Sequence, residues 1–340
     1  MTLPHYNPGV PERTCSISAL VLLAAAAAAE PTAPAAATRF VGSAFGDAAE
    51  VEVLELDAVA TEAAVRAAFV AIAAAEAESR GLAERAATAA GAPLALAPDE
   101  LALLARAQSF CVWSEGTVTA LGGEIYRLWG RRGPAPGRPG ADPLATAAGR
   151  AAGARLTLDA TAPSARVAAG SELDLFPFEA GWAVDRAVAA LTALGVGNAR
   201  VRVGPALRAI GAGPAGRGWP VTFPPLPGAA GPPPPFYLRD RAAALLSIAD
   251  RPLVAGGERV SPYLDLRTGR PVVGRVLVVV VTDLAVDARA LAQAMFVFGP
   301  SAGQLFLGSL QPTPSVLWLL GSGESEPVLA QANWSKVPKR

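Results

Sequence analysis

The sequence has very little of the residue types on which many catalytic and metal sites depend. It contains one histidine, His5, and two cysteines, Cys15 and Cys111, among 340 residues. Two cysteines give neither a disulfide framework nor the ligand spacing of a metal site. His5 falls in the N-terminal leader described below, so the folded part offers no imidazole. A mechanism that needs a histidine base or a histidine metal ligand is therefore excluded there.

The chain also lacks an excess of charge of either sign. Its 29 basic and 29 acidic residues cancel to a formal net charge of zero. Binding to nucleic-acid phosphates requires a basic face, so this balance predicts no nucleic-acid partner. Hydrophobic residues make up 52% of the chain, beside 34 glycines and 31 prolines. That content is sufficient for a sizeable core, in one large domain or in two closely packed subdomains.

Residues 1–38 are typical of a signal peptide. The uncharged apolar run at 17–29 is too short to span a bilayer, and the alanines at 35–37 suit processing. The segment ahead of the run has little net positive charge, because Glu12 offsets Arg13. The alternative interpretation is a disordered Ala/Pro-rich tail. We expect an exported, periplasmic protein, otherwise a cytoplasmic one, with no transmembrane span in the mature chain.

The most informative stretch is 171–211. Pro177 ends the short extended segment 173–175, because proline has no amide proton to donate to a strand. Apolar residues then recur at three- and four-residue spacing over 181–194, which predicts an amphipathic helix. Residues 198–204 alternate between polar and apolar, so a strand with one buried face should follow.

The rest of the chain mixes helical and extended signals. Folded structure is expected over 39–322 and a polar tail over 323–340. The arginines of the Gly/Pro-rich connector 131–142 are typical of a solvated loop. Helices are expected at 62–85, 98–108, 123–130, 143–152 and 283–298, and strands at 51–56, 155–158, 164–167, 219–223, 275–282, 305–310 and 316–320.

Several motif residues occur along these segments in a consistent order. The central stretch contains Asp174, Leu175, Gly181, Asp185, Gly204 and Arg208, and a later turn contains Asp265, Arg267, Thr268, Gly269 and Pro271. Over about residues 39–320 this order resembles the ApbE-type FAD:protein FMN transferases. The resemblance implies an α+β fold, with mixed, mainly antiparallel sheets packed with helices in two intimate subdomains.

The resemblance also implies a function. The family moves FMN from FAD to a Thr or Ser hydroxyl of a target protein, with Mg²⁺ drawing charge off the pyrophosphate. FAD and magnesium are therefore the implied cofactors, and a flavinylated electron-transfer protein is the implied partner. Position by position, the implied FAD-binding residues are Phe45, Asp174, Ala180, Gly181, Asp185, Gly204, Arg208, Asp265, Thr268 and Gly269. The implied metal ligands are Pro177, through a loop carbonyl, and Asp287 and Leu291, one helical turn apart.

This chain departs from the family pattern at several of these positions. In the loop before the predicted helix, Phe176 and Pro177 replace paired glycines, and Ala180 replaces a lysine. In the turn that follows the predicted strand, Pro205 replaces a glycine and Ala206 replaces an acid. Pro262 replaces a histidine, Leu291 replaces a threonine, and Leu121 lies in place of a polar motif. Magnesium requires oxygen ligands in octahedral geometry, which leucine cannot supply.

Two hypotheses follow from these departures. One is a diverged transferase that works with Asp174, Asp287 and backbone groups. The other is a pseudoenzyme that keeps the fold to bind flavin or a partner, and the joint loss of so many site residues favours it. The retained Asp174, Asp185 and Asp265 do not decide between the two, since each could be a cap or turn residue.

Overall fold

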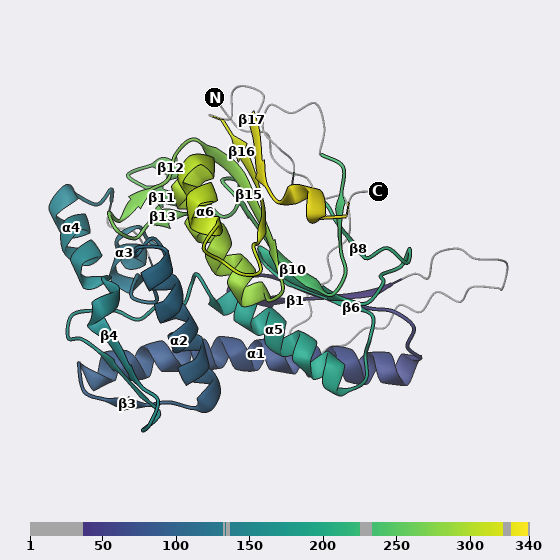
Figure 1. The fold of residues 1–340 in the computed structure, drawn as a ribbon. Coiled ribbons are helices and arrows are strands. Elements are labelled where there is room, and N and C mark those ends of the chain that lie inside the picture. Colours follow the sequence, from purple (N-terminus) through teal and green to yellow (C-terminus); the bar gives the residue numbers. More distant parts are fainter. Residues whose placement is uncertain (1–36, 132, 134–136, 225–232, 322–327, 339–340) are drawn as a thin grey trace.

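The computed structural model describes residues 37–338 except 132, 134–136, 225–232 and 322–327. The expected signal peptide therefore lies outside the described residues, apart from its last two positions. An eight-stranded sheet forms the centre of the protein (Figure 1). In order across the sheet, the strands are β1 (Thr38–Ala44), β2 (Asp47–Val53), β6 (Ala199–Val203), β7 (Ala206–Ile210), β10 (Arg241–Ser247), β15 (Arg275–Thr282), β16 (Ser315–Leu320) and β17 (Val328–Ala332). All neighbouring pairs are antiparallel.

Helices cover one face of this sheet and a small hairpin covers the other. The helical layer contains α1 (Ala58–Ala89), α5 (Glu179–Ala193) and α6 (Ala285–Leu307). The opposite face packs against β8 (Trp219–Val221), β9 (Phe236–Leu238) and the 3₁₀ turn η2 (Trp334–Lys336). The mixed, mainly antiparallel α+β architecture that the sequence predicts is thereby confirmed.

Hydrophobic patterning explains both layers. Every residue of β15 after Arg275 is buried, as expected for a β-branched run between two layers. On β6 the alternation places Ala199, Val201 and Val203 inward, each fully buried, while Arg202 is exposed. The predicted pattern of the central strand is confirmed.

A second, smaller core lies beside the main sheet. It contains the helices α3 (Gly123–Leu128) and α4 (Ala141–Arg150) and two small sheets. One sheet pairs β11 (Leu253–Ala255) with β12 (Glu258–Val260), and the other pairs β13 (Leu264–Asp265) with β14 (Arg270–Pro271). The main core also includes buried residues of α2 (Pro98–Trp113) and of a three-stranded sheet of β3 (Leu94–Ala95), β5 (Ser164–Val167) and β4 (Leu156–Asp159), which the turn η1 (Gly153–Arg155) precedes. The hairpin predicted at 155–167 is confirmed by the pairing of β4 with β5.

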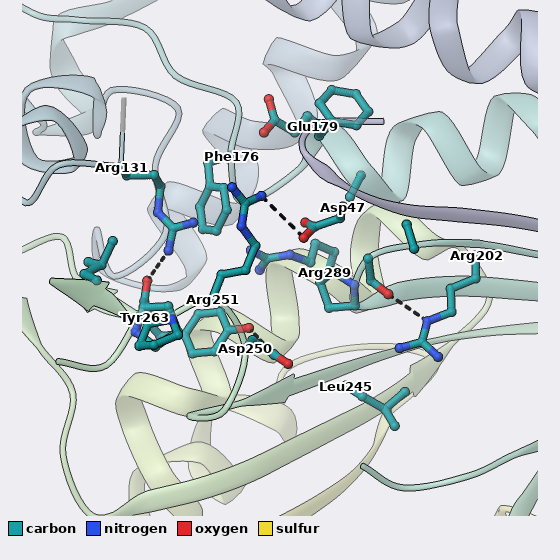
Figure 2. Close-up of a pocket in the computed structure, with 18 of the residues that line it drawn as sticks. Asp47, Arg131, Phe176, Glu179, Arg202, Leu245, Asp250, Arg251, Tyr263 and Arg289 are labelled. Atoms are coloured by element: carbon teal, nitrogen blue, oxygen red, sulfur yellow. Dashed lines mark hydrogen bonds and ion pairs between the residues drawn. The ribbon is translucent and has the colours of Figure 1, made fainter. Parts of the chain in front are cut away.

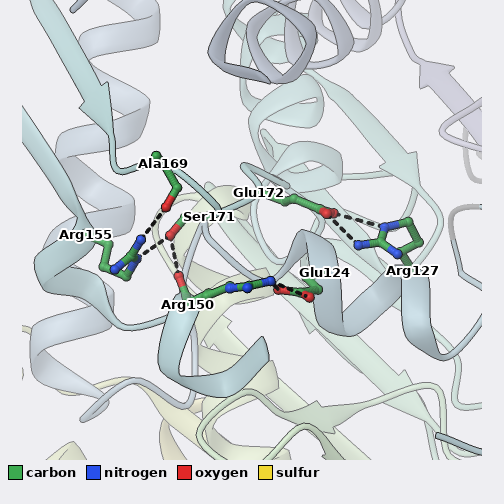
Figure 3. A network of polar contacts seen from close by, with 7 residues as sticks. All are labelled: Glu124, Arg127, Arg150, Arg155, Ala169, Ser171 and Glu172. Atoms are coloured by element: carbon green, nitrogen blue, oxygen red, sulfur yellow. Dashed lines mark hydrogen bonds and ion pairs between the residues drawn. The ribbon is translucent and has the colours of Figure 1, made fainter. Parts of the chain in front are cut away.

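A polar network ties the segment before α5 to the smaller core (Figure 3). Ser171 Oγ donates a 2.7 Å hydrogen bond to the carbonyl oxygen of Arg150 and accepts a 2.6 Å bond from Arg155 Nε. Glu172 forms an ion pair with Arg127 of α3 at 2.6 Å. Exposed pairs of this kind add little stability singly. Together they hold the start of the 171–178 segment, which reaches the candidate site.

Two expectations for the C-terminal part were wrong. Residues 305–310 are not a strand, because α6 continues to Leu307 across a kink at Gly299, whose φ is 68°. Pro300 is tolerated there because the break at Gly299 lets it stand at the start of a new helical segment. The polar tail expected over 323–340 instead contains β17, which pairs with β16, and the buried Trp334.

Among the residues that the structure describes, two helices meet the length and apolar composition of a membrane span, α1 and α6. Both have a place in the packed fold, since α6 lies against the central sheet and α1 packs along α5. A core helix of a soluble protein passes the same test, so the two helices are weak grounds for a membrane span.

Candidate functional site

A cavity of about 700 Å³ opens where both cores and the helical layer meet. Its wall includes the β1–β2 turn, the loop before α5, the β6–β7 turn, the segment 250–254 and the N-terminal part of α6. Among the described residues, four arginines line it, Arg131, Arg202, Arg251 and Arg289, and we name it the arginine cavity (Figure 2). Its volume is in the range of sites that hold cofactor-sized ligands.

Arg289 is the most buried of the four. Its side chain projects from α6 into the cavity and the residue is 1% exposed. Its Nη1 donates a 3.3 Å hydrogen bond to Oε1 of Gln293, one turn further along the helix. Gln293 Nε2 in turn donates to the carbonyl oxygen of Leu264 at 3.4 Å. A glutamine that is itself held in place thus orients the guanidinium of Arg289.

Arg131 approaches the same place from the smaller core. Its Cζ lies 3.8 Å from the ring centroid of Phe176, and that of Arg289 lies 4.8 Å from the same centroid. Arg131 Nη2 donates to the carbonyl oxygen of Pro262 at 2.6 Å, while its Nε has no hydrogen-bond partner among the described residues. Burial lowers the pKa of Arg131, but a guanidinium stays protonated in proteins. Figure 2 shows Phe176 between the two cations.

The other two arginines stand at the mouth of the cavity. Arg251 donates to the carbonyl oxygen of Gly46 at 2.7 Å and pairs with Asp47 at 3.5 Å. Arg202 Nε donates to the carbonyl oxygen of Gly204 at 2.8 Å. Both side chains belong to exposed residues and can reorganise around a ligand.

A hydrogen-bonded acid pair completes the cavity. Tyr263 Oη donates to Asp250 Oδ2 at 2.7 Å, and the same oxygen accepts the Ser247 amide at 2.7 Å. Burial raises the pKa of the Asp250 carboxyl against the opposing effect of these hydrogen bonds. Burial and then the charge of Asp250 hold the pKa of Tyr263 well above its usual value, so Tyr263 stays a donor. Asp250 can therefore accept a proton inside the cavity.

Comparison with known proteins gives the family. The family model described as "ApbE family" matches residues 45–317. The chain belongs to the ApbE family. No curated protein matches.

Solved ApbE structures share the fold. The ApbE protein of Thermotoga maritima is 20% identical with a TM-score of 0.79, and the match covers 90% of this chain and 100% of that one. The flavin transferase ApbE of Vibrio cholerae is 20% identical with a TM-score of 0.74, covering 89% and 99%. The apo flavinyl transferase ApbE of Pseudomonas stutzeri is 20% identical with a TM-score of 0.72, covering 88% and 95%.

Three of the positions implied by the ApbE resemblance line the arginine cavity, namely Phe45, Ala180 and Gly204. Phe45 lies at the β1–β2 turn with a φ of 54°, and its amide donates to Glu76 Oε1 at 3.0 Å. This bond fixes the backbone of Phe45 in a conformation that L-residues rarely adopt.

Four further ApbE positions support the site from behind. Asp174 accepts the amide of Phe176 at 2.8 Å and so shapes the loop that carries this ring. Asp185 accepts the amides of Ala285 and Val286 at 3.0 and 2.9 Å, and pairs with Arg208 at 2.9 Å.

Asp185 thus caps α6, and burial raises its pKa despite these bonds. A Cβ at Gly181 would collide with the carbonyl oxygen of Ala285, so this glycine permits the close crossing of α5 and α6.

The later ApbE motif forms a turn outside the cavity wall. Asp265 accepts from the amide and the guanidinium of Arg267 at 2.9–3.0 Å, and Thr268 is exposed. The carbonyl oxygen of Gly269 accepts Trp129 Nε1 at 2.7 Å. Trp129 is 2% exposed and belongs to the smaller core.

The implied metal ligands do not meet at the arginine cavity. Asp287 and Leu291 line a separate cavity of about 600 Å³ between α2 and α6, where Asp287 forms an ion pair with Arg106. Pro177 is buried and is not part of either wall. Positions two residues apart on a helix differ by about 200° in direction. The face of α6 that meets the arginine cavity therefore carries Arg289 and Gln293 instead.

These residues do not fit a magnesium ion. Within the described ranges, no group of three or more His, Cys, Asp or Glu residues could hold a metal. On the side of α6 that faces the cavity, Arg289 donates a hydrogen bond to Gln293. A positively charged donor cannot serve as a ligand of a cation, which needs oxygen ligands.

Two of the residues that define the site do not stand out in the sequence. Arg131 was expected in a solvated loop, but it packs over Phe176. Arg289 interrupts an apolar helical face, and a lone arginine among alanines and leucines at 285–296 was the available signal.

Proposed function

We propose that this protein is a flavin transferase that binds FAD in the arginine cavity and passes the FMN portion to a hydroxyl of a target protein. One observation carries the proposal: two mostly buried guanidinium groups, Arg131 and Arg289, face a cofactor-sized cavity on an ApbE fold. Arginine is well suited to phosphate oxygens, which it can bind through two parallel hydrogen bonds.

The rest of the cavity suits the remaining parts of FAD. Phe45 presents an aromatic ring at the rim, at the position where the resemblance places a residue near the flavin. Arg202 and Arg251 at the mouth can reach a second phosphate. Aromatic rings pack against planar π systems in offset or edge-to-face geometry. We therefore place the isoalloxazine near Phe45 and the pyrophosphate near Phe176.

The residues of the cavity can also support transfer. The target hydroxyl oxygen bonds to the phosphorus of the FMN portion, the pyrophosphate P–O bond breaks, and AMP leaves with the bridging oxygen. Asp250 accepts the hydroxyl proton, and its Tyr263 hydrogen bond fixes the carboxylate that does so. Arg131 and Arg289 stabilise the negative charge that grows on the departing phosphate.

A second candidate, a non-catalytic flavin-binding protein, is favoured by the poor fit of the cavity to magnesium. Incubation of the protein with FAD and a Thr-containing acceptor protein, followed by in-gel flavin fluorescence, separates the two. A covalent flavin supports transfer. Tight FAD binding with no covalent product at high protein concentration would establish the binding protein instead.

The location and the target belong to the same proposal. The apolar run in residues 1–38 supports export, and an exported flavinylated electron-transfer protein is the partner class that we propose. N-terminal sequencing of the secreted protein tests this point. An intact Met1 or Thr2 start in that material would contradict processing.

A further inference from the structure

We infer that the guanidinium of Arg289 takes the place of a metal ion, so that the arginine cavity binds the phosphate groups of its ligand without magnesium. The inference rests on the proposed binding of FAD, and it names how the pyrophosphate is held. It departs from the metal dependence that the resemblance implies.

The first ground is the position of Arg289. The residue is 1% exposed, lines the cavity, and has its Nη1 bonded to Gln293 Oε1. Within the part of the chain that the structure describes, Nη1 is the one nitrogen of this guanidinium with a hydrogen bond. A guanidinium carries five N–H donors, so Nε and Nη2 keep donors for a ligand.

The second ground is charge balance. Neither Arg131 nor Arg289 forms a salt bridge with a carboxylate of the described residues. The acids of the cavity wall are engaged elsewhere: Asp47 pairs with Arg251, Glu50 with Arg39, Glu179 accepts from Ser79, and Asp250 accepts from Tyr263 and Ser247. Asp250 and Asp174 act on Arg289 and Arg131 through their charges, but not through a direct ion pair among the described residues. An anionic ligand could pair with the two buried guanidinium groups directly and offset the cost of burying them.

The third ground is the loop that replaces a glycine pair. Phe176 lies between the two cations, at 3.8 Å from Arg131 Cζ and 4.8 Å from Arg289 Cζ. Tyr126 packs edge-on against the Phe176 ring at 5.1 Å, which fixes the ring. Cation–π contacts orient guanidinium groups in a partly desolvated site. The segment expected to supply a metal ligand therefore positions two fixed positive charges.

Two guanidinium groups at this place also disfavour magnesium itself. A divalent cation needs oxygen ligands, and the groups that meet here are hydrogen-bond donors of the same sign of charge. A pyrophosphate brings oxygens that pair directly with Arg131 and Arg289.

The test is calorimetric titration of the full-length protein with FAD, in EDTA and in excess Mg²⁺. We expect equal affinities within about threefold. Arg289→Met keeps volume and removes the charge, and it should weaken FAD binding by about 10- to 100-fold, the usual loss for a hydrogen bond to a charged group. Arg106→Met is the matched control in the separate cavity, and Asp287→Ala removes the acid implied as a metal ligand. Both should leave the affinity unchanged.

Each outcome separates this inference from the proposed function. FAD binding that appears only with Mg²⁺, or that is lost in Asp287→Ala, would overturn the guanidinium site and leave the flavin-binding proposal intact. If FAD does not bind under either condition, the proposed function fails. The same titration with inorganic pyrophosphate in EDTA then decides the inference: binding that Arg289→Met abolishes supports it, and no binding overturns it.

Folding of the variants is checked by their melting temperatures. Should Arg289→Met fail to fold, Arg289→Lys retains the charge without the planar donor pair, and it should weaken binding while magnesium stays without effect. Titration of the native protein with FAD in EDTA tests the inference without any substitution, because binding that requires Mg²⁺ would overturn it.

Discussion

Asp185→Ala is expected to destabilise the fold while the affinity of the folded protein for FAD stays unchanged. The carboxylate accepts the amides of Ala285 and Val286 at the start of α6 and pairs with Arg208. Each buried donor left without an acceptor costs about 1–3 kcal/mol. Burial raises the pKa of Asp185, so the ionised group already carries a desolvation cost that reduces the net loss. We therefore expect about 2–3 kcal/mol, or about 4–8 °C in Tm for a domain of this size.

The pH dependence follows from the same pKa. Because the folded pKa of Asp185 lies above its ordinary value of 3.8, the folded state holds this proton more tightly than the unfolded state. The contribution of Asp185 is complete below the unfolded pKa and declines as pH rises through the folded pKa. The destabilisation by Asp185→Ala should therefore be larger at about pH 4 than at about pH 8.

Chemical denaturation at both pH values measures this difference, and FAD titration of the folded variant measures the site. Asp283→Ala is the control two residues from the same helix start, since its ion pair with Arg241 is mostly exposed, and it should cost less than about 1 kcal/mol. A fully stable Asp185→Ala protein that no longer binds FAD would refute the capping role and return this carboxylate to the ligand site.

Three further predictions follow from the packing and the cavity. Gly181→Ala should cost about 1–3 kcal/mol or prevent folding, because its Cβ would collide with the Ala285 carbonyl oxygen. Gly149→Ala, at an exposed helical position of α4 where a Cβ meets no atom within 4 Å, should cost less; thermal melts compare the two. Removal of residues 328–340 should lower Tm, because it strips β17 from β16 and removes buried Trp334; an unchanged Tm would show that this edge is dispensable. Asp250→Asn should abolish FMN transfer without loss of FAD binding, because the carboxylate acts as the base. The transfer rate of the native protein should rise with pH through a pKa above 3.8, since burial raises the pKa of Asp250. A transfer rate that stays constant from about pH 4 to about pH 8 would contradict this role.

Much of the fold could be predicted from the sequence because its signals are local. The periodicity of 181–194 and the alternation of 198–204 correspond to α5 and β6 within two residues. The end of α6 could not be predicted, because Gly299 and Pro300 are typical of a helix end. The segment after them is held by tertiary packing, such as that of Phe298 on Phe306 at 4.2 Å between ring centroids and the burial of Leu307. The pairing of β17 likewise depends on a partner strand and not on its own pattern.

The candidate site was predicted less well, because it depends on direction around a helix. Asp287 and Arg289 are neighbours in the sequence, but they face different cavities. If a motif is assigned two residues away along α6, the assigned residues therefore lie on a face of the helix that does not meet the arginine cavity. Arg131 was equally out of reach, since its contact with Phe176 joins residues that lie far apart in the chain and in different elements.

The replaced residues also support a rebuilt site over a decayed one. A chain selected for folding alone would gain stability from apolar side chains where Arg131 and Arg289 now lie, because buried charges without carboxylate partners oppose folding. Instead, Phe176 contacts both guanidinium groups and Gln293 orients one of them. Phe176, Arg131 and Arg289 are thus parts of one arrangement. The binding of an anion would offset the free-energy cost of burying the two guanidinium groups. The absence of a magnesium ligand set from the described wall of the arginine cavity therefore agrees with the proposed change in how phosphate is held.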